Sequence, residues 1–260
     1  MVTLTKHHGL GNDFLVAIDP TAELTADHAR RWCDRRRGIG ADGLLINLGS
    51  MAQPVMVLFN TDGSRAEMSG NGIRCFVQAI VQRTRLARGT IMVTTDAGLR
   101  AVAIESTEDP HTIMASVSMG EISEIVAPRR WAEMGCDPMR PVAHLSLGNP
   151  HSVIAVEDVN AVDLVEMGGL VPEVNLEVVQ AGPEGDAITM RVHERGAGIT
   201  QACGTGACAA AFAAARWGLV DRGAGDIRVH MEGGDAIVGI GDELTLRGPA
   251  TYIGSVEVHQ

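Results

Sequence analysis

Two glycine-rich stretches determine how this chain is organised. Asp62–Gly72 reads DGSRAEMSGNG, and Gly196–Gly206 reads GAGITQACGTG. The stretches align without a gap at a spacing of 134 residues, so that Gly70 and Gly72 of the first stand opposite glycines of the second. A run rich in helix-forming residues follows each stretch. The same loop before a helix, found twice in one chain, predicts two domains of similar fold.

Two further segments repeat in the same order. Thr90–Glu105 (TIMVTTDAGLRAVAIE) matches Asp226–Gly241 (DIRVHMEGGDAIVGIG) at a spacing of 136 residues. Both show apolar alternation broken by a glycine turn, the pattern of a β-hairpin. Near the N-terminus, Gly11–Asn12 precedes an apolar run in the same way as Gly148–Asn149 does. Glycine-rich chains produce isolated similarities of this kind, but three in one order favour an internal duplication.

The remaining pattern predicts the fold class and the domain bounds. Two long helices are expected at about residues 71–86 and 205–217, and most of the rest has the pattern of short strands. Both helices are apolar over much of their circumference, so each is expected to be surrounded by sheet. Glycine and proline interrupt the strands near residues 118–143. We therefore predict an α+β protein with one domain at 1–118, joined by the C-terminal strand at about 250–260, and a second at 119–249.

Charge and hydropathy exclude several classes of partner. The formal net charge is −11, and the short basic cluster Arg35–Arg37 is interpreted as a solvated helix end. Such an acidic chain is not expected to bind nucleic acid. No apolar run approaches the length of a membrane span, and the N-terminal residues lack an apolar signal core, so we expect a cytoplasmic protein. The oligomeric state stays open, a homodimer included.

Lysine and cysteine usage bear on cofactors and metals. Lys6 is the only lysine and lies outside any phosphate-binding context, so a pyridoxal phosphate enzyme with its lysine Schiff base is not expected. The five cysteines are scattered, form no CxxC pair and have no zinc-ligand partners at useful spacing. We therefore expect reduced thiols, no metal and no cofactor.

The residue before the first glycine of each helix is able to carry chemistry. Cys203 has this place in the second stretch and Ser69 in the first. A helix start offers unpaired N–H groups and a positive dipole end, which bind a carboxylate and stabilise a thiolate, so we expect a lowered pKa for Cys203. Alone, Ser69 would be a helix N-cap and Cys203 a small buried residue. Two such residues in repeat register favour catalysis.

Motifs spread over the chain give it a resemblance to a known family. They are His8–Phe14 (HGLGNDF), Gly38–Gly43 (GIGADG), Asn60–Ser64 (NTDGS), Ser69–Cys75 (SGNGIRC), Gly148–His151 (GNPH), and Glu194–Gly198 (ERGAG) running into Ala202–Gly206 (ACGTG). With them the sequence resembles the diaminopimelate epimerases over nearly its whole length. The resemblance implies two domains, each a strand-rich barrel around a central helix, with the site between them. It also implies interconversion of LL- and meso-diaminopimelate, for lysine and cell-wall precursor synthesis, without cofactor or metal.

The resemblance also implies roles for individual residues. In that family two cysteines face opposite sides of the substrate α-carbon: one, as a thiolate, removes a proton, and the other, as a thiol, returns one. Cys203 matches one of these cysteines, and His151 and Glu194 match residues that assist proton transfer. The small-molecule amino-acid substrate would be bound by Asn12, Asn60, Gly70, Asn71, Asn149, Asn175, Glu194, Arg195, Gly204 and Thr205.

The sequence departs from the family pattern at one catalytic position. The family's other cysteine stands immediately before Gly-Asn-Gly, where this chain has Ser69, and Cys75 lies six residues on, within the helix. A hydroxyl is a much weaker acid than a thiol. Three explanations stay open: a natural variant that still epimerises, a deliberate Cys-to-Ser substitution, and a relative with one-sided deprotonation. We favour the first, because the remaining motifs are complete.

Two other functions stand as alternatives. A proline or hydroxyproline racemase-like enzyme would use the same two-base chemistry, but the asparagine and arginine residues named above favour a substrate with a second amino-acid end. A non-catalytic amino-acid-binding protein would keep both helix starts without exchanging a proton. Solvent exchange at the α-carbon separates the three.

Overall fold

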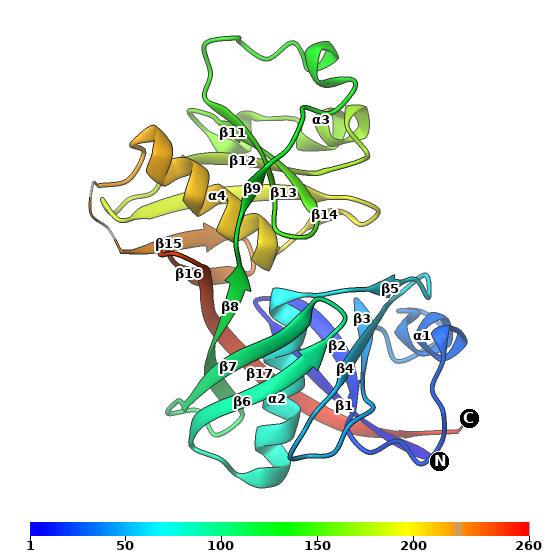
Figure 1. Cartoon of the computed structure of the whole chain (residues 1–260). Coiled ribbons are helices and arrows are strands. Elements are labelled where there is room, and N and C mark those ends of the chain that lie inside the picture. The colour runs from blue at the N-terminus through cyan, green and yellow to red at the C-terminus, as the bar shows by residue number, and fades with distance from the viewer. Residues whose placement is uncertain (222, 224, 260) are drawn as a thin grey trace. The chain divides into compact units, whose positions relative to one another are not determined.

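The computed structural model describes residues 1–221, 223 and 225–259, which form two compact units (Figure 1). Unit 1 comprises Met1–Ser118 together with the C-terminal segment from Gly248, and unit 2 comprises Met119–Arg247. The described part of the chain is rich in strands and has four α-helices, which confirms the predicted α+β class. Gln260, the last residue of the strand expected at about 250–260, lies outside the described residues.

Unit 1 is built from two α-helices and a set of mostly antiparallel strands. The helices are α1 (Ala26–Cys33) and α2 (Gly70–Thr84). The strands are β1 (Val2–Gly9), β2 (Asn12–Ala17), β3 (Gly43–Asn47), β4 (Met56–Asn60), β5 (Arg65–Ala66), β6 (Arg88–Thr95), β7 (Gly98–Ser106), β8 (Thr112–Gly120) and the later part of β17 (Leu244–Val258). β17 pairs antiparallel with β1, so the last strand of the chain lies beside the first.

Unit 2 has a matching set of elements. Its helices are α3 (Leu164–Leu170), α4 (Gly204–Trp217) and the short 3-10 helices η1 (Trp131–Met134) and η2 (Val159–Ala161). Its strands are β9 (Ser123–Glu124), β10 (Val142–Ser146), β11 (Pro150–Ala155), β12 (Asn175–Ala181), β13 (Ala187–Glu194), β14 (Gly198–Thr200), β15 (Asp226–Met231), β16 (Gly234–Gly239) and the first part of β17.

The order and pairing of the elements are the same in both units. A hairpin (β1–β2 or β10–β11) is followed by a short helix, and the next strand pairs in parallel with the second hairpin strand. Phe14 of β2 lies opposite Gly43 of β3, and His151 of β11 lies opposite Asn175 of β12. Each long helix then precedes the hairpin expected from the repeat, β6–β7 or β15–β16. These registers define which residues of the two units are equivalent.

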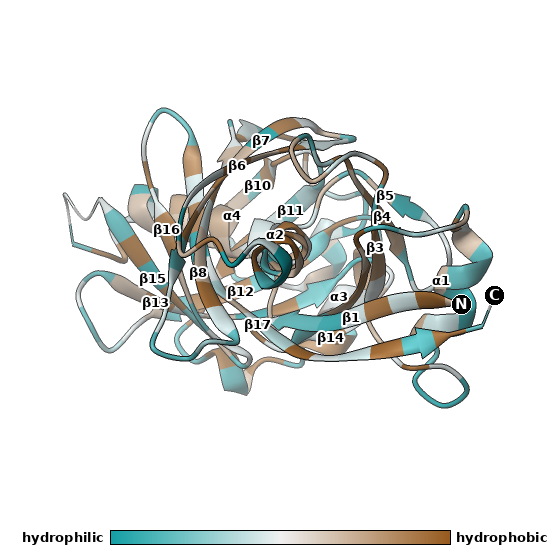
Figure 2. Ribbon diagram, turned by 90° about the horizontal axis from the view of Figure 1, so that it is seen from below, coloured by the Kyte–Doolittle hydropathy of each residue, from teal (hydrophilic) through white to brown (hydrophobic). Residues whose placement is uncertain are grey.

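Helix α2 forms the core of unit 1. All of its residues from Gly70 to Ile80 are buried, with Ile73, Phe76 and Val77 fully enclosed. Figure 2 shows α2 nearly end on, with hydrophobic strand segments around it. Because strands cover this helix on all sides, its sequence is apolar over most of its circumference.

Helix α4 has the same place in unit 2 and is made slim by alanine. Its residues from Gly204 to Ala211 are all buried, and it packs against β10–β13, β15 and β16. It ends at Gly218, whose backbone is left-handed (φ 73°) and whose N–H bonds the Ala214 carbonyl. Glycine takes this conformation without a steric penalty, which explains the sharp end of the helix.

Two local features go beyond the sequence-based expectation. The shorter helices α1 and α3 are not predicted, and the adjacent glycines of α3 lower its helix propensity, so this helix depends on packing. The basic cluster after α1 is exposed at all three arginines, as expected for a solvated helix end. In addition, Arg35 bonds the carboxylates of Asp13 and Asp42.

The described part of the chain has neither a membrane-spanning helix nor a cluster of metal-binding side chains. None of its helices combines the length and the hydrophobicity that a membrane span requires. Nor do three or more of its histidine, cysteine or acidic side chains come together in an arrangement that could hold a metal ion.

Candidate active site

Cys203 stands at the N-cap of α4, directly before the first helical residue. Its backbone is extended (φ −124°, ψ 115°) and its side chain is buried. The Gly206 N–H donates a hydrogen bond to Cys203 Sγ at 3.3 Å, and Thr205 Oγ1 lies 3.6 Å from the sulfur. Position 206 requires glycine, because a Cβ there would lie 2.7 Å from Oε1 of Glu177 and 3.2 Å from the sulfur. The first turn of the helix therefore holds the sulfur in place.

The pKa of the Cys203 thiol is raised well above its usual value, contrary to the sequence-based expectation. Burial is the largest cause, and the carboxyl groups of Glu194 and Glu177 add to it. Hydrogen bonds with Thr205 and with the Gly206 N–H act in the opposite direction but are outweighed. The prediction of a lowered pKa is wrong because it weighs the helix start and leaves out burial. Cys203 therefore rests as a thiol.

A chain of hydrogen bonds leads from Thr205 into the core of unit 2. Asn149 Nδ2 donates to Thr205 Oγ1 at 3.1 Å, and Asn149 Oδ1 lies 3.1 Å from Nε2 of His151. His151 Nδ1 in turn lies 2.6 Å from Oε1 of Glu177, and both of these side chains are fully buried. The structure thus brings four sequence-predicted site residues together, from Cys203 to His151.

Glu177 is the member of this chain that sequence reasoning misses. It lies on β12, where every neighbour from Asn175 to Val179 is buried. A signal was available, since an acidic residue within an apolar, β-branched run is unusual unless it is paired. Burial raises the pKa of Glu177, and the charge and hydrogen bond of His151 only partly offset that effect.

The other predicted residues of unit 2 lie around the ends of β12 and β13. Asn175 Nδ2 donates to the Pro150 carbonyl at 3.1 Å, and Asn175 Oδ1 accepts from the Arg195 N–H at 2.9 Å. Glu194, the last residue of β13, accepts a hydrogen bond from the Thr200 hydroxyl. Asn175 therefore ties the start of β11 to the turn that carries the Arg195 side chain.

Ser69 has the equivalent place in unit 1, at the N-cap of α2. Its backbone is extended (φ −140°, ψ 124°), and its Oγ accepts a hydrogen bond from the Gly72 N–H at 3.0 Å. A Cβ at position 72 would lie 3.0 Å from Cβ of Ser69 and 3.5 Å from the ring of Phe14. The two helix starts thus have the same backbone geometry, with oxygen at one and sulfur at the other.

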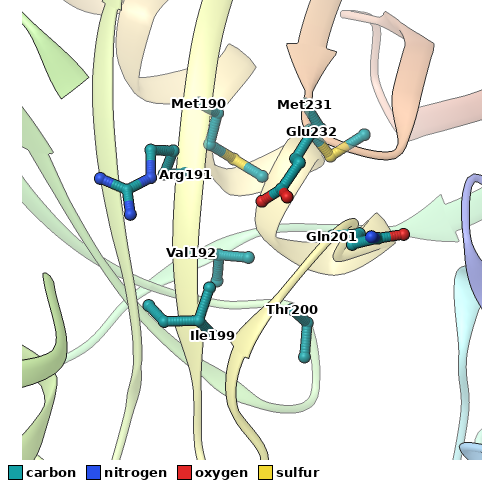
Figure 3. Close-up of a pocket in the computed structure, with 8 residues that line it drawn as sticks. All are labelled: Met190, Arg191, Val192, Ile199, Thr200, Gln201, Met231 and Glu232. Carbon is teal, nitrogen blue, oxygen red and sulfur yellow. The ribbon is translucent and has the colours of Figure 1, made fainter. Parts of the chain in front are cut away.

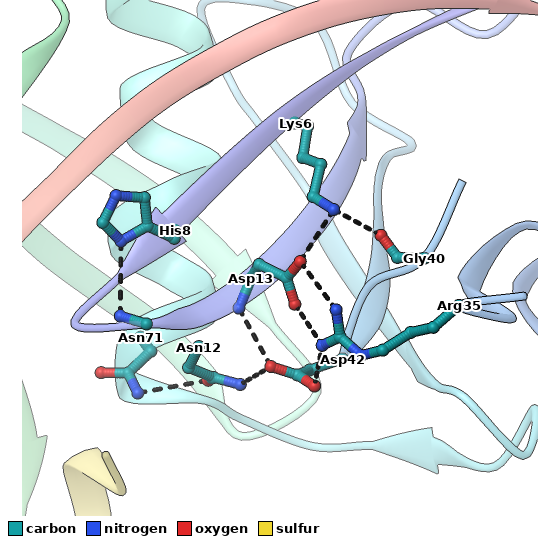
Figure 4. A network of polar contacts seen from close by, with 9 residues as sticks. Lys6, His8, Asn12, Asp13, Arg35, Gly40, Asp42 and Asn71 are labelled. Atoms are coloured by element: carbon teal, nitrogen blue, oxygen red, sulfur yellow. Dashed lines mark hydrogen bonds and ion pairs between the residues drawn. The ribbon is translucent and has the colours of Figure 1, made fainter. Parts of the chain in front are cut away.

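A second polar network lies behind the start of α2 (Figure 4). Arg74, which is fully buried, donates to Asn71 Oδ1 at 2.7 Å, and Asn71 Nδ2 donates to Asn12 Oδ1 at 3.2 Å. Asn12 Nδ2 donates to Asp42 at 2.8 Å, and Asp42 is paired with Arg35 at 2.7 Å. The predicted residues Asn12 and Asn71 are therefore held between two charged groups that the sequence reading does not assign.

Asp13, which is buried, adds two ion pairs to this network. It contacts Lys6 at 2.9 Å and Arg35 at 2.6 Å. Burial alone would raise the pKa of Asp13, but hydrogen bonds and charges from Arg35 and Lys6 outweigh burial and hold it below its usual value. Lys6, the single lysine, thus serves as a structural ion-pair partner (Figure 4).

The remaining predicted residues of unit 1 lie at its loops and helix start. Asn60, the last residue of β4, donates from Nδ2 to the Ser64 hydroxyl at 3.0 Å. Gly70 is the first residue of α2 and is buried, as Gly204 is at the start of α4.

A small pocket in unit 2 does not coincide with the predicted site (Figure 3). Eight residues line it, and all of them differ from the sequence-predicted site residues: Met190, Arg191, Val192, Ile199, Thr200, Gln201, Met231 and Glu232. It lies where β13 pairs with β14 at one end and with β15 at the other. We therefore infer the function from the two hydrogen-bond networks and not from this pocket.

Comparison with known sequences identifies close relatives along the whole chain. The profile of the diaminopimelate epimerase family matches residues 4–125 and 144–253. A diaminopimelate epimerase from Magnetococcus marinus is 41% identical, over 95% of this chain and 94% of that protein. One from Desulfitobacterium hafniense is 37% identical, over 96% of this chain and 95% of that protein.

Solved structures share the fold at much lower sequence identity. A structure from Pseudomonas aeruginosa described as a predicted epimerase superposes with a TM-score of 0.79 at 14% identity, covering 100% of both chains. A hydroxyproline epimerase from Agrobacterium vitis gives a TM-score of 0.72 at 17% identity, covering 98% of this chain and 91% of that one. Identities this low show a common fold and nothing about substrate.

The sequence relatives and the family profile cover both helix starts and both hydrogen-bond networks. This chain belongs to the diaminopimelate epimerase family, a family of amino-acid isomerases.

Proposed function

We propose that this protein interconverts LL- and meso-diaminopimelate by proton transfer at the α-carbon, without a cofactor. Cys203 exchanges the proton at one face of that carbon and Ser69 at the other. The observation that carries the proposal is a buried thiol at the start of α4, bonded by the Gly206 N–H, in a chain with this family membership. Lysine biosynthesis in the cytoplasm is the setting that such an activity implies.

Cys203 is suited to donate a proton to a carbanion. Burial and the neighbouring carboxyl groups raise the pKa of its thiol, so the S–H bond is intact when substrate arrives. On transfer, the S–H bond breaks, a C–H bond forms, and sulfur keeps the electron pair as a thiolate. The Gly206 N–H and the Thr205 hydroxyl then stabilise that charge from 3.3 Å and 3.6 Å. In the reverse direction the thiolate removes the same proton.

Ser69 is expected to limit the rate. Its hydroxyl is a far weaker acid than a thiol, so an alkoxide base is scarce near neutral pH. The Gly72 N–H, which donates to Oγ at 3.0 Å, gives the same stabilisation that Cys203 receives from its helix. The reaction is therefore possible at Ser69, but slower than with a thiol.

The polar residues of each unit supply contacts for the two amino-acid ends of the substrate. N–H groups at the starts of α2 and α4 suit the carboxylate that lies beside the reacting carbon. Arg195 suits the distal carboxylate through a bidentate contact. Asn12 and Asn149 are held in fixed orientations by their hydrogen bonds, which prepares their amides to bind substrate without an ordering cost.

Hydrogen–deuterium exchange at the α-carbon tests this proposal. The chain as it stands would be incubated in D₂O with LL-diaminopimelate, meso-diaminopimelate, L-proline and trans-4-hydroxy-L-proline, with exchange followed by NMR. We expect exchange with both diaminopimelate forms. Exchange with a proline substrate alone would replace the proposed substrate, and diaminopimelate binding without exchange would identify a binding protein instead.

A further inference from the structure

Glu177 has a fully buried carboxyl group that neither transfers a proton nor binds substrate in the proposed reaction. Its Oε1 lies 2.6 Å from His151 Nδ1 and 2.7 Å from the place where a Cβ of residue 206 would stand. Its Oε2 has no hydrogen-bond partner within the described residues. Burying a carboxyl group with an unsatisfied oxygen is costly. The buried Glu177 carboxyl group beneath the first turn of α4 therefore lowers the stability of unit 2.

The equivalent place in unit 1 shows that the fold does not require a carboxyl group there. Phe14 pairs with Gly43 as His151 pairs with Asn175, so Leu45, two residues after Gly43, is equivalent to Glu177. Phe14 and Leu45 are both buried and apolar. The same strands therefore pack stably with an apolar pair, and the buried His151–Glu177 pair is a property of the Cys203 side alone.

The hydrogen bonds fix where the protons of this chain lie. Asn149 donates from Nδ2 to Thr205, so its Oδ1 faces His151 and can only accept. Nε2 of His151 must then carry a proton. A single proton lies between His151 Nδ1 and Glu177 Oε1, and the pair is electrically neutral whichever atom holds it.

These contacts have a consequence at the sulfur. Because Thr205 Oγ1 accepts from Asn149, its own proton is available to the Cys203 sulfur 3.6 Å away. A His151 ring that rotated, or that lost the proton on Nε2, would release the Asn149 amide. The Thr205 hydroxyl would then be able to donate to Asn149 instead, and the thiolate would lose a donor.

We propose that Glu177 is a positioning residue for the Cys203 half of the reaction, which rests on the proposed function. It holds the His151 ring with its Nε2 proton towards Asn149 and, through Asn149, keeps the Thr205 hydroxyl directed at the sulfur. Its effect is on stabilisation of the thiolate rather than on substrate affinity.

Three full-length variants test this role. Glu177→Leu introduces the residue that unit 1 has at this place, Glu177→Gln keeps the shape but removes the carboxyl group, and Val179→Ala is the control. Val179 is fully buried on the same face of β12, two residues on. We measure kcat for α-hydrogen loss in D₂O from the diastereomer that Cys203 deprotonates, a step that Ser69 does not limit. We expect Glu177→Leu and Glu177→Gln to lower this kcat about 10-fold to 100-fold, by analogy with the hydrogen-bond partners of metal-binding histidines, with KM little changed. Val179→Ala should lose stability but keep kcat.

NMR spectroscopy detects the His151–Glu177 hydrogen bond directly, without substrate. ¹⁵N-labelled protein should show a strongly downfield proton from the short His151–Glu177 hydrogen bond, assigned by its loss in His151→Gln. Both Glu177 variants should lose this signal, and Val179→Ala should keep it.

If either Glu177 variant folds and keeps wild-type kcat, or if Val179→Ala lowers kcat equally, the positioning role is refuted. If neither Glu177 variant folds, a signal that is absent from the wild type refutes it, and a signal that is present supports it.

The two proposals fail in different ways. A wild-type protein that shows the downfield signal but exchanges no diaminopimelate proton would remove the proposed function and leave the His151–Glu177 arrangement intact. A wild-type protein that exchanges the proton, with Glu177→Leu equally active, would remove the positioning role alone.

Discussion

The two helix starts share a backbone but differ in what lies behind them. At the start of α4, Cys203 is backed by the buried His151–Glu177 pair. At the start of α2, the places equivalent to His151 and Glu177 hold the apolar Phe14 and Leu45. The fully buried charged residue is Arg74 instead, whose equivalent in α4 is Cys208. The duplicated fold thus supplies two N-cap positions with the same backbone geometry. The side chains packed behind them make the two positions chemically different.

The largest expected effect comes from removing the sulfur. Cys203→Ala should lower α-carbon exchange by on the order of 10³-fold or more, because it removes the group that carries the proton. Cys208→Ala is the matched control, since it removes a fully buried sulfur from the same helix, five residues after Cys203. The measurement is deuterium incorporation from D₂O, and equal activity of the two variants would contradict a catalytic Cys203.

The next effect comes from making the two helix starts chemically alike. Ser69→Cys should raise turnover by on the order of 10²-fold, because a thiol ionises far more readily than a hydroxyl. Ser69→Ala should abolish turnover in both directions. Steady-state rates with both diastereomers check this pair, and a Ser69→Ala variant as active as the wild type would remove Ser69 from the mechanism.

The buried charged residue of α2, Arg74, gives a smaller effect, on stability rather than on rate. Arg74→Met should lower the free energy of unfolding by about 1–3 kcal/mol, because it removes the buried guanidinium that donates to Asn71 Oδ1. Arg83→Met, on the exposed side of the same helix, should cost less than about 1 kcal/mol. Urea unfolding compares them, and equal losses would contradict a structural role for the buried guanidinium.

The smallest expected effect is a difference in acid stability. His7, buried in β1, is opposite Phe14 in unit 1, and the equivalent position in unit 2 is Leu145. Burial lowers the pKa of His7 from 6.5 to about 3, with His8 contributing. Its folded-state pKa is depressed, so the stability it supports is present above pH 6.5 and is lost progressively as pH falls towards 3.

Replacing this histidine by its counterpart tests the acid effect. Between pH 6.5 and 5.5 the wild type should lose about 1 kcal/mol more than His7→Leu, since only the unfolded wild type takes up the extra proton. Thermal unfolding across this pH range measures the difference. Parallel pH profiles for the two proteins would show that His7 is not buried in its neutral form.

The features of this protein that could be predicted from sequence are local ones. The glycine pattern predicts both helix starts. Each pair of glycines lies within a few residues of the helical run that follows it, so one short window of sequence contains the whole signal. The strand alternation predicts the two hairpins for the same reason. The α+β class and the central helices follow from these segments alone.

The features that could not be predicted depend on contacts across the sheet. His151 and Glu177 are 26 residues apart and meet through the parallel pairing of β11 and β12, which no local pattern shows. The raised pKa of Cys203 has the same origin. Burial and the carboxyl groups of Glu194 and Glu177, which other strands bring near the sulfur, outweigh the pKa-lowering effect of the helix start. Asp42 and Arg74 are visible within motifs, but their role in orienting Asn12 and Asn71 appears only once the strands are packed.

The most direct measurement of the central claim is the initial rate of α-carbon hydrogen loss in D₂O, taken separately from LL- and from meso-diaminopimelate. If sulfur removes the proton from one form and oxygen from the other, the two rates should differ by at least an order of magnitude, and Ser69→Cys should bring them together. Equal rates in the unaltered chain, or loss from neither form, would contradict a mechanism divided between Cys203 and Ser69.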